Sequence, residues 1–111
     1  MEPADKKEEE EEEVEESKAL PSLLRPFAHS TACNLSNNEL TSLPAEFGQL
    51  TALTHCELSH NQLTALPREF GQLIALTHCF LSFNKLTSLP AELGQLTALT
   101  RCYLNKNARQ L

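Results

Sequence analysis

The sequence from residue 53 to residue 75, LTHCELSHNQLTALPREFGQLIA, decides the fold of this chain, because the 23 residues that follow repeat it with 16 identities. In the same frame, residues 30–52 form a copy before it, and residues 99–111 form the first part of a copy after it. Repetition with a fixed period of this length is the sequence signature of a solenoid. The sequence therefore predicts a short stack of three full units and one partial unit.

Each unit begins with a short stretch in which apolar and polar residues alternate. Cys56-Glu57-Leu58 shows this alternation, which is typical of a strand with one buried face. Leu66-Pro67 follows, and proline stops further strand pairing because it lacks a backbone donor. The remainder, residues 68–75, is too short for a stable helix alone. We therefore expect a short strand and then a 3₁₀ or short helical return in every unit.

This pattern resembles the leucine-rich repeat, L-x-x-L-x-L-x-x-N-x-L-x-x-L-P-x-x-F-G-x-L, over roughly residues 19–111. It is most similar to the intracellular repeats of Ras-suppressor and scribble-type scaffold proteins, except that cysteine stands where the family usually has its fourth-position leucine. The resemblance implies an α/β solenoid with a parallel sheet on a concave face and a 3₁₀, irregular or short-helical convex side. It does not name a ligand.

The flanks of the repeats divide the chain into two parts. Residues 1–18 carry ten acidic and three basic side chains, so residues 19–111 hold about +1 of the net charge of −6. A run of glutamates with little apolar area cannot offset the entropy of ordering, so we expect a disordered acidic tail. The solenoid then covers residues 19–111, with a half repeat at 20–29, repeats at 30–52, 53–75 and 76–98, and a partial repeat at 99–111.

Charge and hydropathy also limit the partners and the location. The acidity argues against nucleic acid, whose phosphates would be repelled. No apolar run approaches the roughly 20 residues that span a bilayer, and the beginning of the chain lacks a secretory signal. We therefore expect no membrane association and a cytoplasmic protein, with the nucleus as the alternative location.

Two series of side chains recur at the same position of every unit and are predicted to have structural roles. The asparagines lie at the bend after the strand and can satisfy backbone groups there. The cysteines stack in one row, which does not suit the tetrahedral geometry of zinc, so we expect reduced, buried thiols and no cofactor. The central pair should be better protected than the terminal pair. The series are Asn38, Asn61, Asn84 and Asn107, and Cys33, Cys56, Cys79 and Cys102.

The outward-facing strand positions differ between the units, and there we predict the partner site. An aromatic cluster faces water with no core to serve, which is typical of an interaction surface. Histidines and one arginine lie along its side with a single glutamate, a composition that favours an anionic or mixed-charge peptide. A metal or acid–base site is the alternative, although no third ligand position is enforced. The candidate partner-binding residues are Phe80, Phe83, Tyr103, His55, His78, Arg101 and Glu57.

Two functions are consistent with these features. The leading hypothesis is a non-enzymatic module that binds a protein partner on its concave strand surface. The alternative is a truncated isoform or remnant of a larger repeat protein with a structural or regulatory role, in which the acidic tail contacts basic partners. Because the last unit has no polar cap, we also expect self-association through the C-terminal end.

Overall fold

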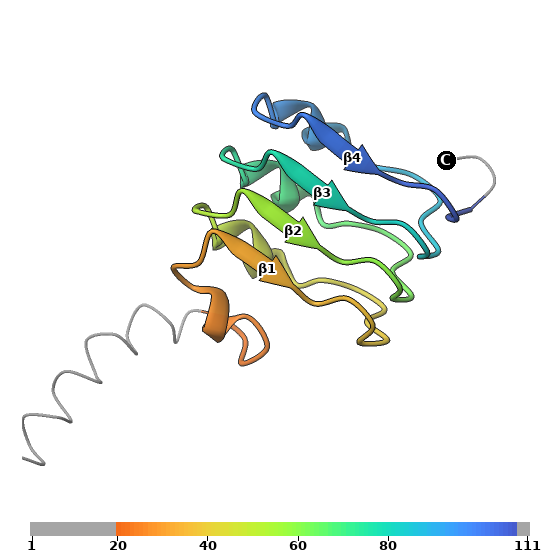
Figure 1. Cartoon of the computed structure of the whole chain (residues 1–111), viewed down its shortest axis with the longest axis horizontal. Helices are drawn as coiled ribbons and strands as arrows, with labels where there is room; N and C mark the ends of the chain where they lie inside the picture. Colours follow the sequence, from red (N-terminus) through yellow and green to blue (C-terminus); the bar gives the residue numbers. More distant parts are fainter. Residues whose placement is uncertain (1–19, 109–111) are drawn as a thin grey trace, which may run out of the picture.

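The computed structural model describes residues 20–108, which form one parallel sheet of four strands in the order β1-β2-β3-β4. Figure 1 shows the strands side by side and the 3₁₀ helices stacked behind them. The predicted solenoid is confirmed, and the returns that follow the first three strands are 3₁₀ helices. The elements are η1 Arg25–Phe27, β1 Ala32–Asn34, η2 Ala45–Gln49, β2 His55–Glu57, η3 Arg68–Gln72, β3 His78–Phe80, η4 Ala91–Gln95 and β4 Arg101–Tyr103.

The strands pair in a uniform register, so that every residue lies opposite the residue 23 positions away. Cys56 of β2 lies opposite Cys33 of β1 and opposite Cys79 of β3, and Cys79 lies opposite Cys102 of β4. Equivalent side chains of successive units therefore form columns across the sheet. The inward columns build the core, and the outward columns build the surface discussed below.

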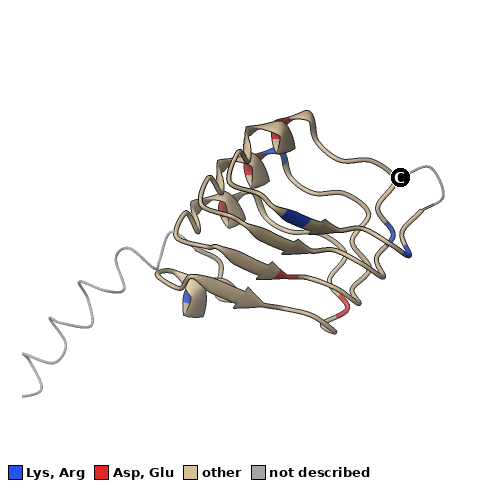
Figure 2. Ribbon diagram, turned by 45° about the horizontal axis from the view of Figure 1, so that its top comes forward, with Lys and Arg blue, Asp and Glu red and all other residues tan. Residues whose placement is uncertain are grey.

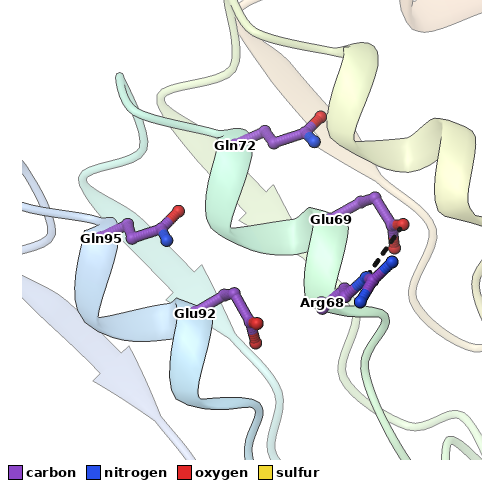
Figure 3. A pocket seen from close by; sticks show the side chains of 5 residues that line it. All are labelled: Arg68, Glu69, Gln72, Glu92 and Gln95. Atoms are coloured by element: carbon purple, nitrogen blue, oxygen red, sulfur yellow. Dashed lines mark ion pairs between the residues drawn. The ribbon is translucent and has the colours of Figure 1, made fainter.

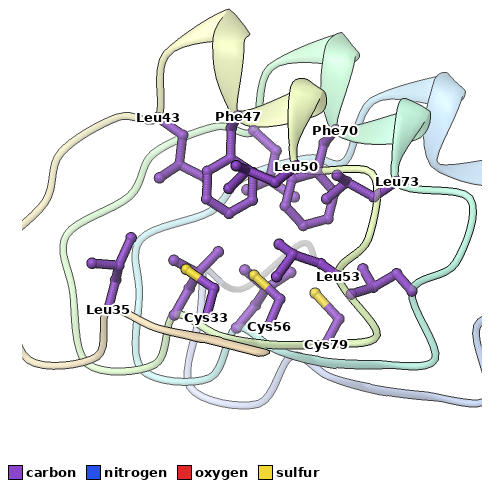
Figure 4. Packing of buried hydrophobic residues seen from close by; sticks show 14 of the residues in the cluster. Cys33, Leu35, Leu43, Phe47, Leu50, Leu53, Cys56, Phe70, Leu73 and Cys79 are labelled. Carbon is purple, nitrogen blue, oxygen red and sulfur yellow. The ribbon is translucent and has the colours of Figure 1, made fainter. Parts of the chain in front are cut away.

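The core lies between the sheet and the 3₁₀ helices (Figure 4). The cysteine side chains of the strands and the leucines that flank the strands face Phe47, Phe70 and the leucines of the returns. The Phe47 and Phe70 rings stack with centroids 5.6 Å apart, and both side chains are fully buried. Each unit thus buries its apolar residues largely against the equivalent residues of its neighbours, as expected of a solenoid.

The accessibility of the cysteines differs from the prediction at one end of the row. Cys102 is half-buried, as expected for a terminal unit, whereas Cys33 is as well buried as Cys56 and Cys79. The prediction for Cys33 was wrong because Leu20 and Leu24, which precede the first strand, are themselves buried in the core cluster that includes it.

Asparagine side chains join successive units at the bends after β2, β3 and β4. The Asn61 amide Nδ2 donates to the carbonyl oxygens of Leu35 and Leu58, and its Oδ1 accepts from the backbone N–H groups of Asn38 and Leu40. Asn84 and Asn107 make equivalent bonds one and two units further on. Because these amides satisfy backbone groups on both sides of the interface, the predicted structural role is confirmed for Asn61, Asn84 and Asn107. The Asn38 side chain is exposed and donates to the carbonyl oxygen of Ser36 in its own turn.

Glycine allows the 3₁₀ helices to approach one another closely. A Cβ atom on Gly48 would lie 2.3 Å from the backbone oxygen of Glu69, and one on Gly71 would lie 2.4 Å from that of Glu92. No heavy atom lies within 4 Å of the equivalent position on Gly94. Glycine is therefore required by packing in η2 and η3 and not in η4 of this chain.

Within residues 20–108, the structure has no helix that combines the length and the apolar character needed to cross a membrane.

Candidate partner-binding face

The outward side chains of the four strands and of the turns after them form one surface, which we call the strand face. Because the register is uniform, the strand face consists of three columns that run across the sheet. The first column is Ala32, His55, His78 and Arg101; the second is Asn34, Glu57, Phe80 and Tyr103; the third, in the turns, is Asn37, His60, Phe83 and Lys106.

The first column brings the two predicted histidines together. The rings of His55 and His78 stack with centroids 4.3 Å apart and an angle of 7° between their planes. Each ring also has its Nδ1 atom within 3.0 Å of the hydroxyl of the preceding residue, Thr54 or Thr77. The pKa of His78 is lowered, first because its charged form is partly desolvated and then because His55 and Arg101 repel a positive charge there.

The second column places two aromatic rings next to each other. Phe80 and Tyr103 stack with centroids 5.0 Å apart. A guanidinium nitrogen of Arg101 donates a hydrogen bond of 3.2 Å to the hydroxyl oxygen of Tyr103, and this contact raises the pKa of Arg101. Four of the five N–H donors of this guanidinium remain free of that bond, so a partner has access to them.

The third column has an unusual backbone conformation. Asn37, His60, Phe83 and Lys106 all have φ between 59° and 62°, in the left-handed region. Asparagine tolerates this region, whereas a bulky side chain is strained by about 1–2 kcal/mol. Phe83 nevertheless occupies it with 44% of its surface exposed, and its ring stacks on His60 at 4.3 Å.

Charges on the strand face are unevenly distributed along the stack (Figure 2). Glu57 in β2 is the only acidic residue of the three columns, and Arg101 and Lys106 are their two basic residues. The Glu57 carboxylate accepts a hydrogen bond from the backbone N–H of Ser59 at 3.0 Å, so the Glu57 side chain points toward the turn that follows β2. On the opposite side of the solenoid, each of η2, η3 and η4 carries a glutamate in its first turn. The strand face is therefore the more basic of the two sides near β4.

No metal centre is assembled among residues 20–108, and the four thiols differ in their acidity. No group of three or more His, Cys, Asp or Glu side chains is placed to hold a metal ion in this part of the chain. Burial raises the pKa of the Cys56 thiol well above its ordinary value. The pKa of Cys102 is lowered to about 7 by a hydrogen bond with Cys79, although burial opposes this change.

A hollow of about 340 Å³ lies on the other side, between η3 and η4 (Figure 3). It is bordered by the Arg68–Glu69 ion pair, with 3.6 Å between Nε and Oε2, and by polar side chains of the next unit. Its five lining residues are Arg68, Glu69, Gln72, Glu92 and Gln95. This hollow is an open gap between two 3₁₀ helices with two carboxylates in it, and all five lining residues are polar or charged.

The sequence placed the candidate residues on one face correctly but missed some of their contacts. His55, His78 and Arg101 lie in one column, Phe80 and Tyr103 form the stacked pair, and Phe83 lies in the next column. Glu57 lies opposite Phe80 and accepts a hydrogen bond from the backbone N–H of Ser59.

One residue of the strand face was not among the candidates. The ring of His60 stacks on that of Phe83 and supports it. The threonine bonds were also missed, and their signal was threonine at one position of all four units, namely Thr31, Thr54, Thr77 and Thr100.

Comparison with known proteins agrees with this architecture. The family model described as "Leucine Rich Repeat" matches residues 31–50 and 52–73. Among solved structures, a leucine-rich-repeat protein of Leptospira interrogans aligns with 67% of this chain at 49% identity and a TM-score of 0.66. This chain spans 19% of the length of that protein. No curated protein matches the chain significantly. The chain matches this family in sequence and has its parallel sheet and its recurring inward leucines. The chain is therefore a leucine-rich-repeat protein.

Proposed function

We propose that this chain is a non-enzymatic interaction module that binds a protein partner on its strand face. Leucine-rich-repeat domains bind proteins in general, and a parallel sheet with exposed side chains in columns offers a wide, regular contact surface. The residues that we assign to the contact are Phe80, Phe83, Tyr103, His55, His78, Arg101 and Glu57.

The observation that carries this proposal is the conformation of Phe83. Nothing in the fold requires an aromatic residue there, because 44% of the side chain is exposed and the backbone is in a region that suits asparagine. Residues held in such conformations are often retained for function, and exposed aromatic residues are enriched at the centres of interfaces. Tyr103, with 38% of its surface exposed, extends the same patch.

Affinity capture followed by quantitative mass spectrometry tests the proposal. The baits are the intact chain, Phe80→Ala, Tyr103→Ala and the control Ile74→Ala. Ile74 is 64% exposed in the turn after η3, so its replacement removes exposed apolar surface away from the strand face. We expect the two strand-face variants to lose the same captured proteins while Ile74→Ala retains them. Equal capture by all four folded baits would refute the assignment of the site.

A fifth bait without residues 1–18 addresses the alternative function. Those residues lie outside the described part of the chain, and their sequence carries ten acidic side chains. If the acidic tail is the active part, capture persists in the strand-face variants, disappears on removal of the tail, and favours basic proteins.

Self-association of this chain is a separate proposal. The outer edge of β4 is unpaired within residues 20–108, and Leu99, Cys102 and Leu104 near it are only partly buried. Unpaired strand edges next to apolar surface promote association. Sedimentation at increasing concentration should therefore show a growing average mass, and a single monomeric species at high concentration would argue against this proposal.

A further inference from the structure

The threonine column determines which nitrogen of each strand-face histidine carries a proton. The Thr54 hydroxyl donates to the carbonyl oxygen of Thr31 at 3.1 Å, and the Thr77 hydroxyl donates to that of Thr54 at 2.9 Å. A hydroxyl has one proton, so each threonine oxygen can only accept from the neighbouring ring. The Nδ1 atoms of His55 and His78 are therefore donors, at 3.0 and 2.9 Å.

This arrangement fixes what the Nε2 atom of each ring can do. In the neutral state each Nε2 is a hydrogen-bond acceptor, since the only proton is on Nδ1. When the His78 ring gains a second proton, its Nε2 becomes a positively charged donor on the side of the ring away from Thr77. His78 thus changes from an acceptor to a cationic donor without losing the bond that orients it.

The surroundings of His78 favour a negative ligand. His55 stacks on it from β2, Arg101 lies opposite it on β4, and Phe80 follows it on its own strand. The further ionisable groups of the face are Tyr103, bonded to Arg101, and Glu57, bonded to the Ser59 backbone, together with His60 and Lys106 in the third column. A positive charge on His78 therefore meets two neighbours that oppose it, and a partner carboxylate would relieve that repulsion.

Apolar contact surface lies directly beside this column. The stacked pair Phe80 and Tyr103 occupies the second column, and the pair His60 and Phe83 occupies the third. On these grounds, we propose that the strand face recognises an acidic peptide segment in which carboxylates alternate with apolar side chains. The carboxylates contact His55, His78 and Arg101, and the apolar side chains contact Phe80 and Phe83. This inference rests on the proposed function and specifies its partner.

The proposal has a pH dependence whose sign follows from linkage. A bound carboxylate raises the pKa of His78, so the complex holds more protons than the free components between the free and bound pKa values of that ring. Affinity therefore rises as pH falls through that interval, by about tenfold if binding raises the pKa by one. A peptide that contacts only the aromatic side chains shows no such rise.

Selection of random peptides displayed on phage tests the inference without a known partner. The full chain is the target at pH 6, and Phe80→Ala is used for counter-selection so that only peptides of the strand face remain. We expect the selected peptides to be rich in Asp, Glu and apolar residues and poor in Lys and Arg. Selected peptides that are neutral or basic would overturn the acidic partner while supporting the proposed function. Failure to select any peptide that depends on Phe80 would count against both.

Fluorescence anisotropy with one selected peptide and its twin, in which Gln and Asn replace Glu and Asp, completes the test. The acidic peptide should bind the intact chain more tightly at pH 6 than at pH 8, and the amide twin should bind weakly at both. His78→Gln should weaken the pH dependence, and Arg101→Gln should lower the affinity at both pH values. Arg68→Gln removes another exposed cation, from η3 on the opposite side, and should change nothing. Equal loss in Arg68→Gln and Arg101→Gln would show attraction by net charge alone and overturn the assigned contacts.

Discussion

At the scale of single residues, identical side chains in one column have different chemistry because their neighbours differ. Burial raises the pKa of Cys33 to about 12, whereas the hydrogen bond with Cys79 lowers that of Cys102 to about 7. The period of the sequence predicts that both thiols point inward. The half repeat at 20–29 indicates a cover over the first unit, but the period contains neither how completely that cover encloses Cys33 nor the direction of the bond between the last two thiols.

The buried thiols should make the fold sensitive to alkaline pH. Cys33 stays protonated in the folded state above pH 9, whereas the unfolded chain loses that proton near pH 9. The contribution of Cys33 to stability is therefore complete below pH 9 and is lost between pH 9 and about 12, by at most about 1.4 kcal/mol per pH unit. Urea unfolding across this range should show a shallower decline for Cys33→Ala than for the intact chain. Parallel declines in both proteins would contradict the assignment.

Phe83→Asn should separate stability from binding. The substitution removes left-handed strain of about 1–2 kcal/mol and loses a ring contact with His60 worth about 0.5–1.5 kcal/mol. The free energy of unfolding should therefore change by less than about 1 kcal/mol, while affinity for a strand-face peptide falls at least about tenfold, as for other aromatic hot spots. Unfolding in urea and fluorescence anisotropy measure the two quantities. A strongly destabilised variant would mean that Phe83 serves the fold.

At the scale of the elements, each strand and each 3₁₀ helix is positioned by the equivalent element of the next unit. The alternation in Cys56-Glu57-Leu58 and the proline after Leu66 sufficed to predict a strand and a turn. The left-handed turn residues could not be predicted, because His60 and Phe83 give no sign of that conformation in the sequence. The structure reveals it in their φ angles of 59°.

Replacing the equivalent glycines of η3 and η4 by alanine should have different effects on the free energy of unfolding. Gly71→Ala would place Cβ 2.4 Å from the Glu92 oxygen, so η4 must move, at a cost of about 1–3 kcal/mol. Gly94→Ala meets no atom within 4 Å, and it should leave stability unchanged or raise it by up to about 1 kcal/mol. Urea unfolding followed by circular dichroism compares the two variants. Equal destabilisation would show that Gly94 is covered, for example by a second copy of the chain.

At the scale of the whole molecule, the solenoid has few interfaces among which to share its stability. The fold and the boundaries of the repeats could be predicted because every unit repeats the same inward leucines. The pairing of rings on the strand face could not, because it depends on which side chains meet in each column. Leu58 and Leu81 are fully buried between neighbouring units, and Leu104 in the last unit is only partly buried.

Truncation of these equivalent leucines should give graded losses. Leu58→Ala and Leu81→Ala should each cost about 2–5 kcal/mol, a large part of the stability of so small a domain. Leu104→Ala should cost clearly less, since less of its side chain leaves water on folding. Thermal unfolding by circular dichroism provides the comparison. Cooperative, near-native transitions in the first two variants would show that the stack has more reserve than its few interfaces suggest.

The uniform register also bears on how recombination can alter the gene of such a chain. If residues 53–75 were lost in frame, Gly48 would meet Glu92 as Gly71 does now, and the N–H of Leu40 would reach the side-chain oxygen of Asn84. The shorter protein would keep interfaces of a kind already present. The strand face would lose the histidines and the glutamate of that unit and retain its aromatic residues. Unequal exchange between repeats thus alters what the face presents one unit at a time, while the stack beneath it is preserved.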